Sequence, residues 1–222
     1  MKIDKNEKRL FSFDDLFKML EMQSELNKKY SGEKWYEKIP DWKIKTAVFT
    51  ETAEMFEELS HEWKWWKNKE FDKAKAIEEA VDILHFDLSL LLKYAGGNME
   101  TVKEWLKIYK EKTDMEILLE TYEEHLNNFS FEMFDKIFEM TRDKLFNKLP
   151  KGEKENFAVF GNFLNAFLVF YYYICELFEI DAFVLVDAYM FKNQKNHKRV
   201  EGGYKEGKYD KSQEETYKLE QA

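Results

Sequence analysis

The chain contains little glycine and almost no proline. Its 222 residues include 8 Gly and 2 Pro. These are too few for the many corners of a β-sandwich or barrel, whereas Lys, Glu, Leu and Ala abound. The expected fold class is therefore all-α. One domain of this length buries roughly 70% of its unfolded surface, and a hydrophobic content of 44% supplies a core. We expect a single domain over residues 1–222.

Cysteine and long apolar segments are also scarce. Cys175 is the only cysteine, which excludes an intrachain disulfide and a Cys-x-x-Cys zinc site. The N-terminus has no long apolar segment, and the most apolar stretch, 157–183, is interrupted by polar residues such as Asn165 and Glu176. We expect an unprocessed cytoplasmic protein that does not enter a membrane, in which oxygen ligands hold any bound metal.

Positive charge is in deficit. The chain has 35 Lys+Arg against 44 Asp+Glu, a net charge of −9, which argues against a general binder of nucleic acid or anionic membranes. Basic residues nevertheless gather in the segment 192–211, which has seven of them against three acidic residues and includes Gly202, Gly203 and Gly207. This pattern predicts a flexible basic segment that closes over a polyanion. A solvated, disordered terminus is the alternative.

Capping and stop signals divide most of the chain into helices. Ser12 with Asp14 and Asp15 predicts one helix start, Asn98 is expected to cap another, and Gly96-Gly97 predicts a helix stop. A second and a third helix precede that stop and are expected to form an antiparallel pair over residues 41–95. The predicted helices cover about 12–30, 41–60, 71–94, 98–112, 113–128, 130–149, 153–179 and 181–196.

Two pairs of acidic residues lie on the antiparallel pair. Glu51 and Glu54 are three residues apart, as are Glu79 and Asp82, so each pair projects from one helical face beside apolar residues. If these faces meet, the four carboxylates converge, and their repulsion demands a divalent cation, Mg²⁺ or Mn²⁺. Such a site can bridge a polyphosphate and activate a water molecule. Glu58 is a further candidate ligand for the metal. The alternative is that these acidic residues lie on a solvent-exposed helix face and bind no metal.

The order and spacing of these motifs resemble a known superfamily. The Glu51-x-x-Glu54 pair, a gap of 24 residues, and the Glu79-x-x-Asp82 pair followed by Ile-Leu-His85-Phe86 are similar to the all-α nucleoside triphosphate pyrophosphatases, which include MazG-like enzymes and dimeric dUTPases. The segments 23–27, 64–67 and 189–211 resemble the dimeric dUTPase branch. The resemblance implies a helical bundle that hydrolyses dUTP to dUMP and pyrophosphate, a homodimer, and a requirement for magnesium. It also raises dUDP as a second substrate.

The resemblance further implies roles for individual residues. Glu51, Glu54, Glu79 and Asp82 hold the metal, and Glu54 activates the water, although the residues alone do not separate Glu54 from Glu51 as the base. Basic and hydroxyl groups of the C-terminal lid, 192–211, bind phosphate. Side-chain amides read the uracil edge, Phe86 and one tryptophan stack on the base, and His85 is an oriented polar group. The expected substrate-binding residues are Gln23, Asn27, Lys64, Trp65, Trp66, His85, Phe86, Lys192, Asn196, Arg199, Tyr204 and Lys211.

Several alternatives stay open from the sequence. Phe86 suits core packing, and Gln23 suits a helix surface. The activity has two rivals: a related pyrophosphatase that acts on dCTP or on nucleoside triphosphates broadly, and a helical interaction protein whose acidic faces are solvated and whose aromatic residues bind a partner helix. Magnesium binding separates the enzymes from the interaction protein, and a substrate panel separates the two enzymes.

Overall fold

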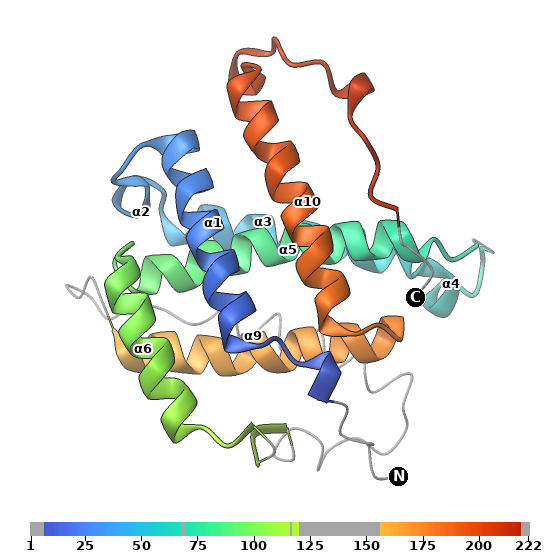
Figure 1. The fold of residues 1–222 in the computed structure, drawn as a ribbon. Helices are drawn as coiled ribbons and strands as arrows, with labels where there is room; N and C mark the ends of the chain where they lie inside the picture. Colours follow the sequence, from blue (N-terminus) through green and yellow to red (C-terminus); the bar gives the residue numbers. More distant parts are fainter. Residues whose placement is uncertain (1–6, 68–69, 116, 120–155, 219–222) are drawn as a thin grey trace. The chain divides into compact units, whose positions relative to one another are not determined.

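The predicted all-α class is confirmed. The structure is a computed structural model that describes residues 7–67, 70–115, 117–119 and 156–218, and these contain helices and no strand (Figure 1). The predicted helices 113–128 and 130–149 lie mostly outside the described residues. The α-helices are α1 (Phe13–Ser31), α2 (Trp35–Lys38), α3 (Asp41–Glu58), α4 (Ser60–Trp63), α5 (Lys73–Tyr94), α6 (Met99–Lys112), α9 (Phe157–Phe178) and α10 (Ala182–Glu201). Three short 3₁₀ helices span Glu7–Arg9, Tyr204–Glu206 and Lys211–Gln213.

The caps that the sequence predicts are formed. The Ser12 hydroxyl accepts a hydrogen bond from the backbone N–H of Asp15 at 3.0 Å, and the Asn98 side chain accepts from two N–H groups at the start of α6. Such caps satisfy donors that have no partner inside the helix. Several boundaries differ from the prediction, and α9, for example, begins at Phe157 and not at 153. The helix from Asp41 breaks at Leu59, and α10 continues past 196 to Glu201, because its next strong stop signal is the pair Gly202-Gly203.

The chain divides into two compact units. Unit 1 comprises residues 1–18 and 90–183, and unit 2 comprises 19–89 and 184–222. In unit 1, α9 is buried on nearly every side. Two of the polar residues that interrupt its apolar sequence have partners there, because Glu176 forms an ion pair with Arg9 and Asn165 accepts a hydrogen bond from Tyr109. A charged group is rarely buried unless it is paired in this way.

Helix α9 also has the composition of a membrane span. Within the described part of the chain it is the one helix long and apolar enough, by length and composition alone, to cross a membrane. However, 67% of its most apolar window is buried inside the protein. A helix that is apolar all round suits either a protein core or a membrane, and here its side chains contribute to the core of unit 1.

In unit 2, the segment after α10 folds back along that helix (Figure 1). The Tyr217 hydroxyl donates to Asp187 at 3.1 Å, and its ring centroid lies 5.7 Å from that of Phe191. Glycine makes the turn sterically accessible: a Cβ on Gly202 would lie 2.4 Å from the Tyr209 ring, and Gly203 has φ of 76°. The predicted lid 192–211 is therefore half helix, because its first ten residues belong to α10.

Candidate metal centre and nucleotide cavity

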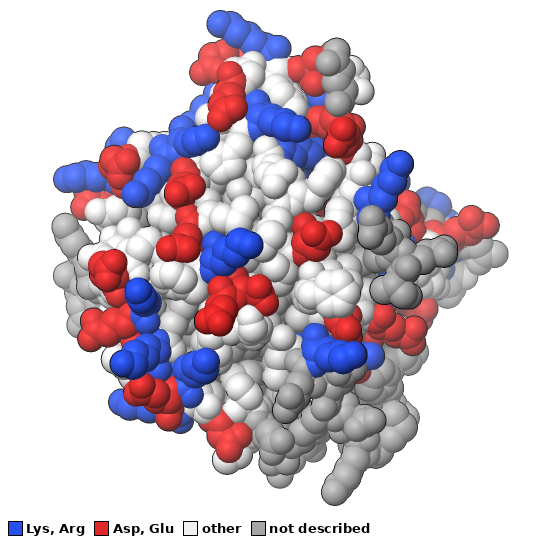
Figure 2. Space-filling view, viewed as in Figure 1, with Lys and Arg blue, Asp and Glu red and all other residues white. Residues whose placement is uncertain are grey.

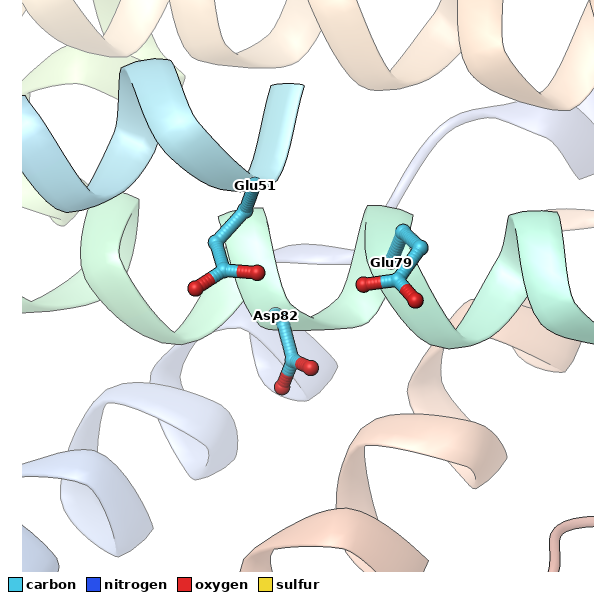
Figure 3. A group of neighbouring side chains, drawn as sticks. All are labelled: Glu51, Glu79 and Asp82. Carbon is cyan, nitrogen blue, oxygen red and sulfur yellow. The ribbon is translucent and has the colours of Figure 1, made fainter. Parts of the chain in front are cut away.

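Three of the four predicted metal ligands lie together in unit 2. One carboxylate oxygen each from Glu51 on α3 and from Glu79 and Asp82 on α5 lie within 4.8 Å of one another (Figure 3). The helical spacing of three residues places Glu79 and Asp82 on the same side of α5. Glu54, the fourth predicted ligand, is exposed and is not part of this group. Its negative charge nevertheless acts on both Glu51 and Glu79.

Burial and mutual repulsion make these carboxylates hard to ionise. Burial, then the charges of Asp82 and Glu54, raise the pKa of Glu51 and of Glu79 to about 7. Burial also raises the pKa of Asp82 above its ordinary value, although Lys192 acts in the opposite direction. A bound divalent cation would remove this penalty, and three close carboxylates are the oxygen donors that a hard cation prefers. The donor set therefore fits a divalent metal ion.

A lysine already supplies part of the missing positive charge. The buried Lys192 ammonium on α10 lies 2.8 Å from Asp82 Oδ2 and 3.1 Å from Glu78 Oε1. Lys195 lies 3.4 Å from the same Glu78 oxygen. Burial tends to lower the pKa of Lys192, but the two carboxylates outweigh it and raise that pKa. Sequence analysis missed Glu78, although it directly precedes Glu79 and so lies at the edge of the same acidic run.

A cavity of about 530 Å³ lies beside the acidic cluster in unit 2. This volume is typical of a small-molecule site. Residues of α1, α5 and α10 line it at helical spacing, three or four residues apart, so each helix presents one face that carries both polar and apolar side chains. Nine of the predicted site residues are among its walls: Gln23, Asn27, Glu51, Asp82, His85, Phe86, Asn196, Arg199 and Tyr204.

The amides at one end of the cavity form a hydrogen-bonded network. Gln23 Nε2 donates to Asn27 Oδ1 at 3.0 Å and to Ser89 Oγ at 3.1 Å, and Asn27 Nδ2 donates to Ser89 Oγ at 3.0 Å. Gln23 Oε1 accepts from His85 Nδ1 at 2.7 Å. Gln23 is thus a buried residue, not the surface amide that the alternative envisaged. Ser89 also belongs to this network. It lies four residues after His85 on the same helix, so helical spacing could have identified it.

Arginine and tyrosine from α10 and the following turn form another part of the cavity wall. Arg199 makes two parallel bonds to Glu214, at 2.6 and 2.7 Å, and a third to Asn196 Oδ1 at 3.1 Å. Its guanidinium carbon lies 5.8 Å from the centroid of the Tyr204 ring, and Lys211 Nζ lies 5.0 Å from that same centroid. Glu214 was not predicted, because no local pattern distinguishes it within the polar C-terminal sequence.

Three predicted residues between the acidic pairs lie outside the cavity walls. Lys64 forms an ion pair with Glu57, and its ammonium lies 4.8 Å from the centroid of the Trp63 ring. Trp65 is 90% exposed and packs edge-on against Trp66. The structure therefore brings neither tryptophan of the pair to the cavity. Their predicted stacking on the base stays a prediction.

The arrangement defines a class of enzyme. Clustered carboxylates beside basic side chains and an amide-lined cavity suit a metal-assisted hydrolase of nucleotide polyphosphates. The comparison with protein families agrees with this, because a family model described as dUTPase matches residues 15–204. The chain belongs to this all-α dUTPase family, and its activity is the hydrolysis of dUTP. A search of curated proteins finds no match.

The raised pKa values predict a pH-dependent stability for the metal-free enzyme. A carboxyl whose folded pKa is near 7 binds more protons in the folded than in the unfolded state between pH 4.5 and 7, so stability falls as pH rises through this window. Glu79→Gln removes the ionisation. We expect its free energy of unfolding to exceed that of the parent increasingly from pH 4.5 to 7, measured by urea unfolding with EDTA.

The control for this experiment is Glu104→Gln, a change of the same kind at an exposed position on α6. Its difference from the parent should stay constant with pH. A constant difference for Glu79→Gln as well would show that Glu79 ionises normally in the folded protein.

Proposed function

We propose that the cavity of unit 2 hydrolyses dUTP to dUMP and pyrophosphate in a magnesium-dependent reaction. The single observation that carries this proposal is the position of the three close carboxylates beside a cavity lined by amides and by Arg199. When bound, Mg²⁺ supplies positive charge that neutralises the triphosphate and orients it. Glu51, Glu79 and Asp82 would hold the ion, and Mn²⁺ could replace it at such oxygen ligands.

Glu54 is the proposed general base. It lies outside the group of three ligands but near enough to act electrostatically on Glu51 and Glu79, so it can hold a water molecule beside the ion. The water oxygen attacks the α-phosphorus, its proton passes to the Glu54 carboxylate, and the bond to the pyrophosphate oxygen breaks. Hydrolysis of dUDP in the same way would give dUMP and phosphate in place of pyrophosphate, because dUDP contains the same α–β anhydride. We include dUDP as a second substrate.

The remaining polar residues bind the two ends of the nucleotide. Asn27, His85 and Asn196 face the uracil edge, and the half-buried Phe86 stacks on the base. Arg199, Tyr204 and the lysines Lys192 and Lys211 contribute donors to phosphate oxygens. Figure 2 shows acidic and basic side chains intermixed on the viewed face, which fits a small nucleotide better than a nucleic acid as the partner. The lone, buried thiol of Cys175 suits a cytoplasmic location.

The first experiment tests the carboxylates and the metal together. Asp82→Asn and Glu51→Gln keep the side-chain shape but lose charge, so each should lower kcat for dUTP about a thousandfold, or ~4 kcal/mol, by removing contacts to a metal-held transition state. Pyrophosphate release with and without Mg²⁺ measures this, and calorimetry measures Mg²⁺ affinity. Glu104→Gln is the matched control. Activity of the parent in EDTA, or normal turnover of both variants, would contradict the proposal.

The second experiment concerns the pairing of Arg199 with Glu214. The two parallel bonds leave the guanidinium engaged by a carboxylate, so a phosphate group must displace Glu214 to bind there. Glu214→Gln weakens the competitor and should lower KM for dUTP about threefold to tenfold with little change in kcat. Steady-state kinetics measures both constants.

The control for this experiment is Glu215→Gln, which makes the same charge change at the exposed neighbouring position. Its KM should match that of the parent. A raised KM in Glu214→Gln would show instead that Glu214 orients Arg199 for the substrate and does not compete with it.

We also propose a homodimer formed through the outer face of α3. Trp42 and Phe49 are seven residues apart on that helix and are 64% and 58% exposed. Large exposed aromatic residues on one face mark a contact surface, and the occupant we propose is a second copy of the chain. A double variant, Trp42→Glu with Phe49→Glu, should therefore be monomeric by light scattering after gel filtration, with unchanged circular dichroism.

The matched control for the dimer is Phe183→Glu, because Phe183 is 59% exposed at the start of α10. This variant should stay dimeric. A parent protein that is monomeric at micromolar concentration, or a double variant that stays dimeric, would refute the proposed surface.

A further inference from the structure

Tyr189 on α10 is a fully buried tyrosine that contacts the amide network from behind the cavity. Its hydroxyl lies 3.0 Å from the Met19 carbonyl and 3.1 Å from Gln23 Oε1, and it accepts a hydrogen bond from Asn193 Nδ2 at 3.3 Å. Its ring lies against His85, with centroids 4.5 Å apart. Tyr189 is not among the residues that line the cavity. Its contacts therefore act on the nucleotide only through Gln23 and His85.

The hydrogen bonds of Gln23 leave its amide one orientation. Oε1 faces two donors, His85 Nδ1 and the Tyr189 hydroxyl, while Nε2 faces two acceptors, Asn27 Oδ1 and Ser89 Oγ. A side-chain amide has two acceptor lone pairs and two N–H bonds, so these four groups occupy all of them when the Tyr189 hydrogen points to Oε1 and not to the Met19 carbonyl. Turning the amide over would place Oε1 against Asn27 Oδ1, which has no hydrogen to donate. Gln23 is thus a fixed hub, with no donor or acceptor left over for a base.

This orientation also determines the proton on His85. Gln23 Oε1 can only accept, so Nδ1 carries the hydrogen, and the other nitrogen of the neutral ring is a bare acceptor. Burial lowers the pKa of His85 to about 3, which keeps the ring neutral. Its Nε2 is buried and has no hydrogen-bond partner in the part of the chain that the structure describes. Because His85 lines the cavity, a donor on a bound ligand is the partner that this atom lacks.

We propose that Tyr189 and Ser89 are positioning residues that hold Gln23 and His85 in one hydrogen-bond polarity and so make the cavity select uracil over cytosine. The ring N3 of uracil carries a hydrogen and can donate to His85 Nε2. The N3 of cytosine carries a lone pair, which would face the lone pair of that nitrogen and repel it. This inference rests on the proposed function, which places the base in the same cavity.

The test compares dUTP with dCTP in conservative variants. Tyr189→Phe removes only the hydroxyl and keeps the ring against His85. We expect kcat/KM for dUTP to fall about tenfold, mainly through KM, and the ratio of dUTP to dCTP to fall by about the same factor. Ser89→Ala removes the acceptor shared by Gln23 and Asn27 and should lower the ratio similarly. If Tyr189→Phe loses the helical circular dichroism signal, the ratio measured on Ser89→Ala still tests the proposal.

The matched control is Tyr172→Phe, which removes a hydroxyl from an equally buried tyrosine on α9 in unit 1. It should leave the dUTP to dCTP ratio unchanged even if stability changes. An unchanged ratio in both Tyr189→Phe and Ser89→Ala would overturn the inference, as would equal losses for the two substrates. Failure of the proposed function looks different: Asn27→Ala and Asn196→Ala would then leave the KM for dUTP unchanged.

Discussion

The repulsion among Glu51, Glu79 and Asp82 is the constraint on which the rest of unit 2 depends. The packing of α3 on α5 brings these partly buried carboxylates within 4.8 Å of one another, where they resist ionisation. Two kinds of cation can relieve that cost. Lys192 does so within the protein, through its contacts with Asp82 and Glu78, and a divalent ion suits the same oxygens. The single charge of Lys192, on a flexible side chain, could be displaced by the proposed metal ion.

Helix α10 repeats this arrangement along one side. Lys192, Lys195 and Arg199 lie three and four residues apart, and each is paired with a carboxylate of the protein itself. Their partners come from α5 and from the segment after α10. Basic residues suited to a triphosphate are therefore neutralised before any nucleotide binds. Phosphate then exchanges one anionic partner for another, so its net gain is smaller than the strength of the new bonds suggests.

The amide network of the cavity is built differently. Its polar groups are neutral and bonded to one another, from the half-buried Asn27 through Gln23 to His85 and Tyr189, which are buried. A network of this kind has one low-energy arrangement, because turning a member leaves buried donors and acceptors unpaired. Such rigidity suits the proposed discrimination between bases. The exchangeable ion pairs of α10 suit the proposed binding of a di- or triphosphate.

Most of the local structure was predictable from the sequence. The scarcity of glycine and proline predicted the all-α class, and the caps at Ser12 and Asn98 are formed as predicted. The spacing of Glu79 and Asp82 likewise predicted that they share one face of α5, whereas their meeting with Glu51 of α3 depended on how the two helices pack. These features depend on residues a few positions apart, whose geometry within a helix is nearly constant. The same periodicity could also have identified Ser89 from His85.

Partners distant in the chain were decided only by the tertiary structure. Helical periodicity tells which face of a helix a residue occupies, but not which side chain from another helix it meets. The contact of Gln23 with His85 spans 62 residues, and nothing in the polar C-terminal sequence distinguishes Glu214 as the partner of Arg199. Packing likewise left Trp65 exposed and away from the cavity, although its sequence motif predicted a base-stacking residue. The sequence by itself determined the helices and the chemistry of their faces, whereas the packing of those faces determined which groups became partners.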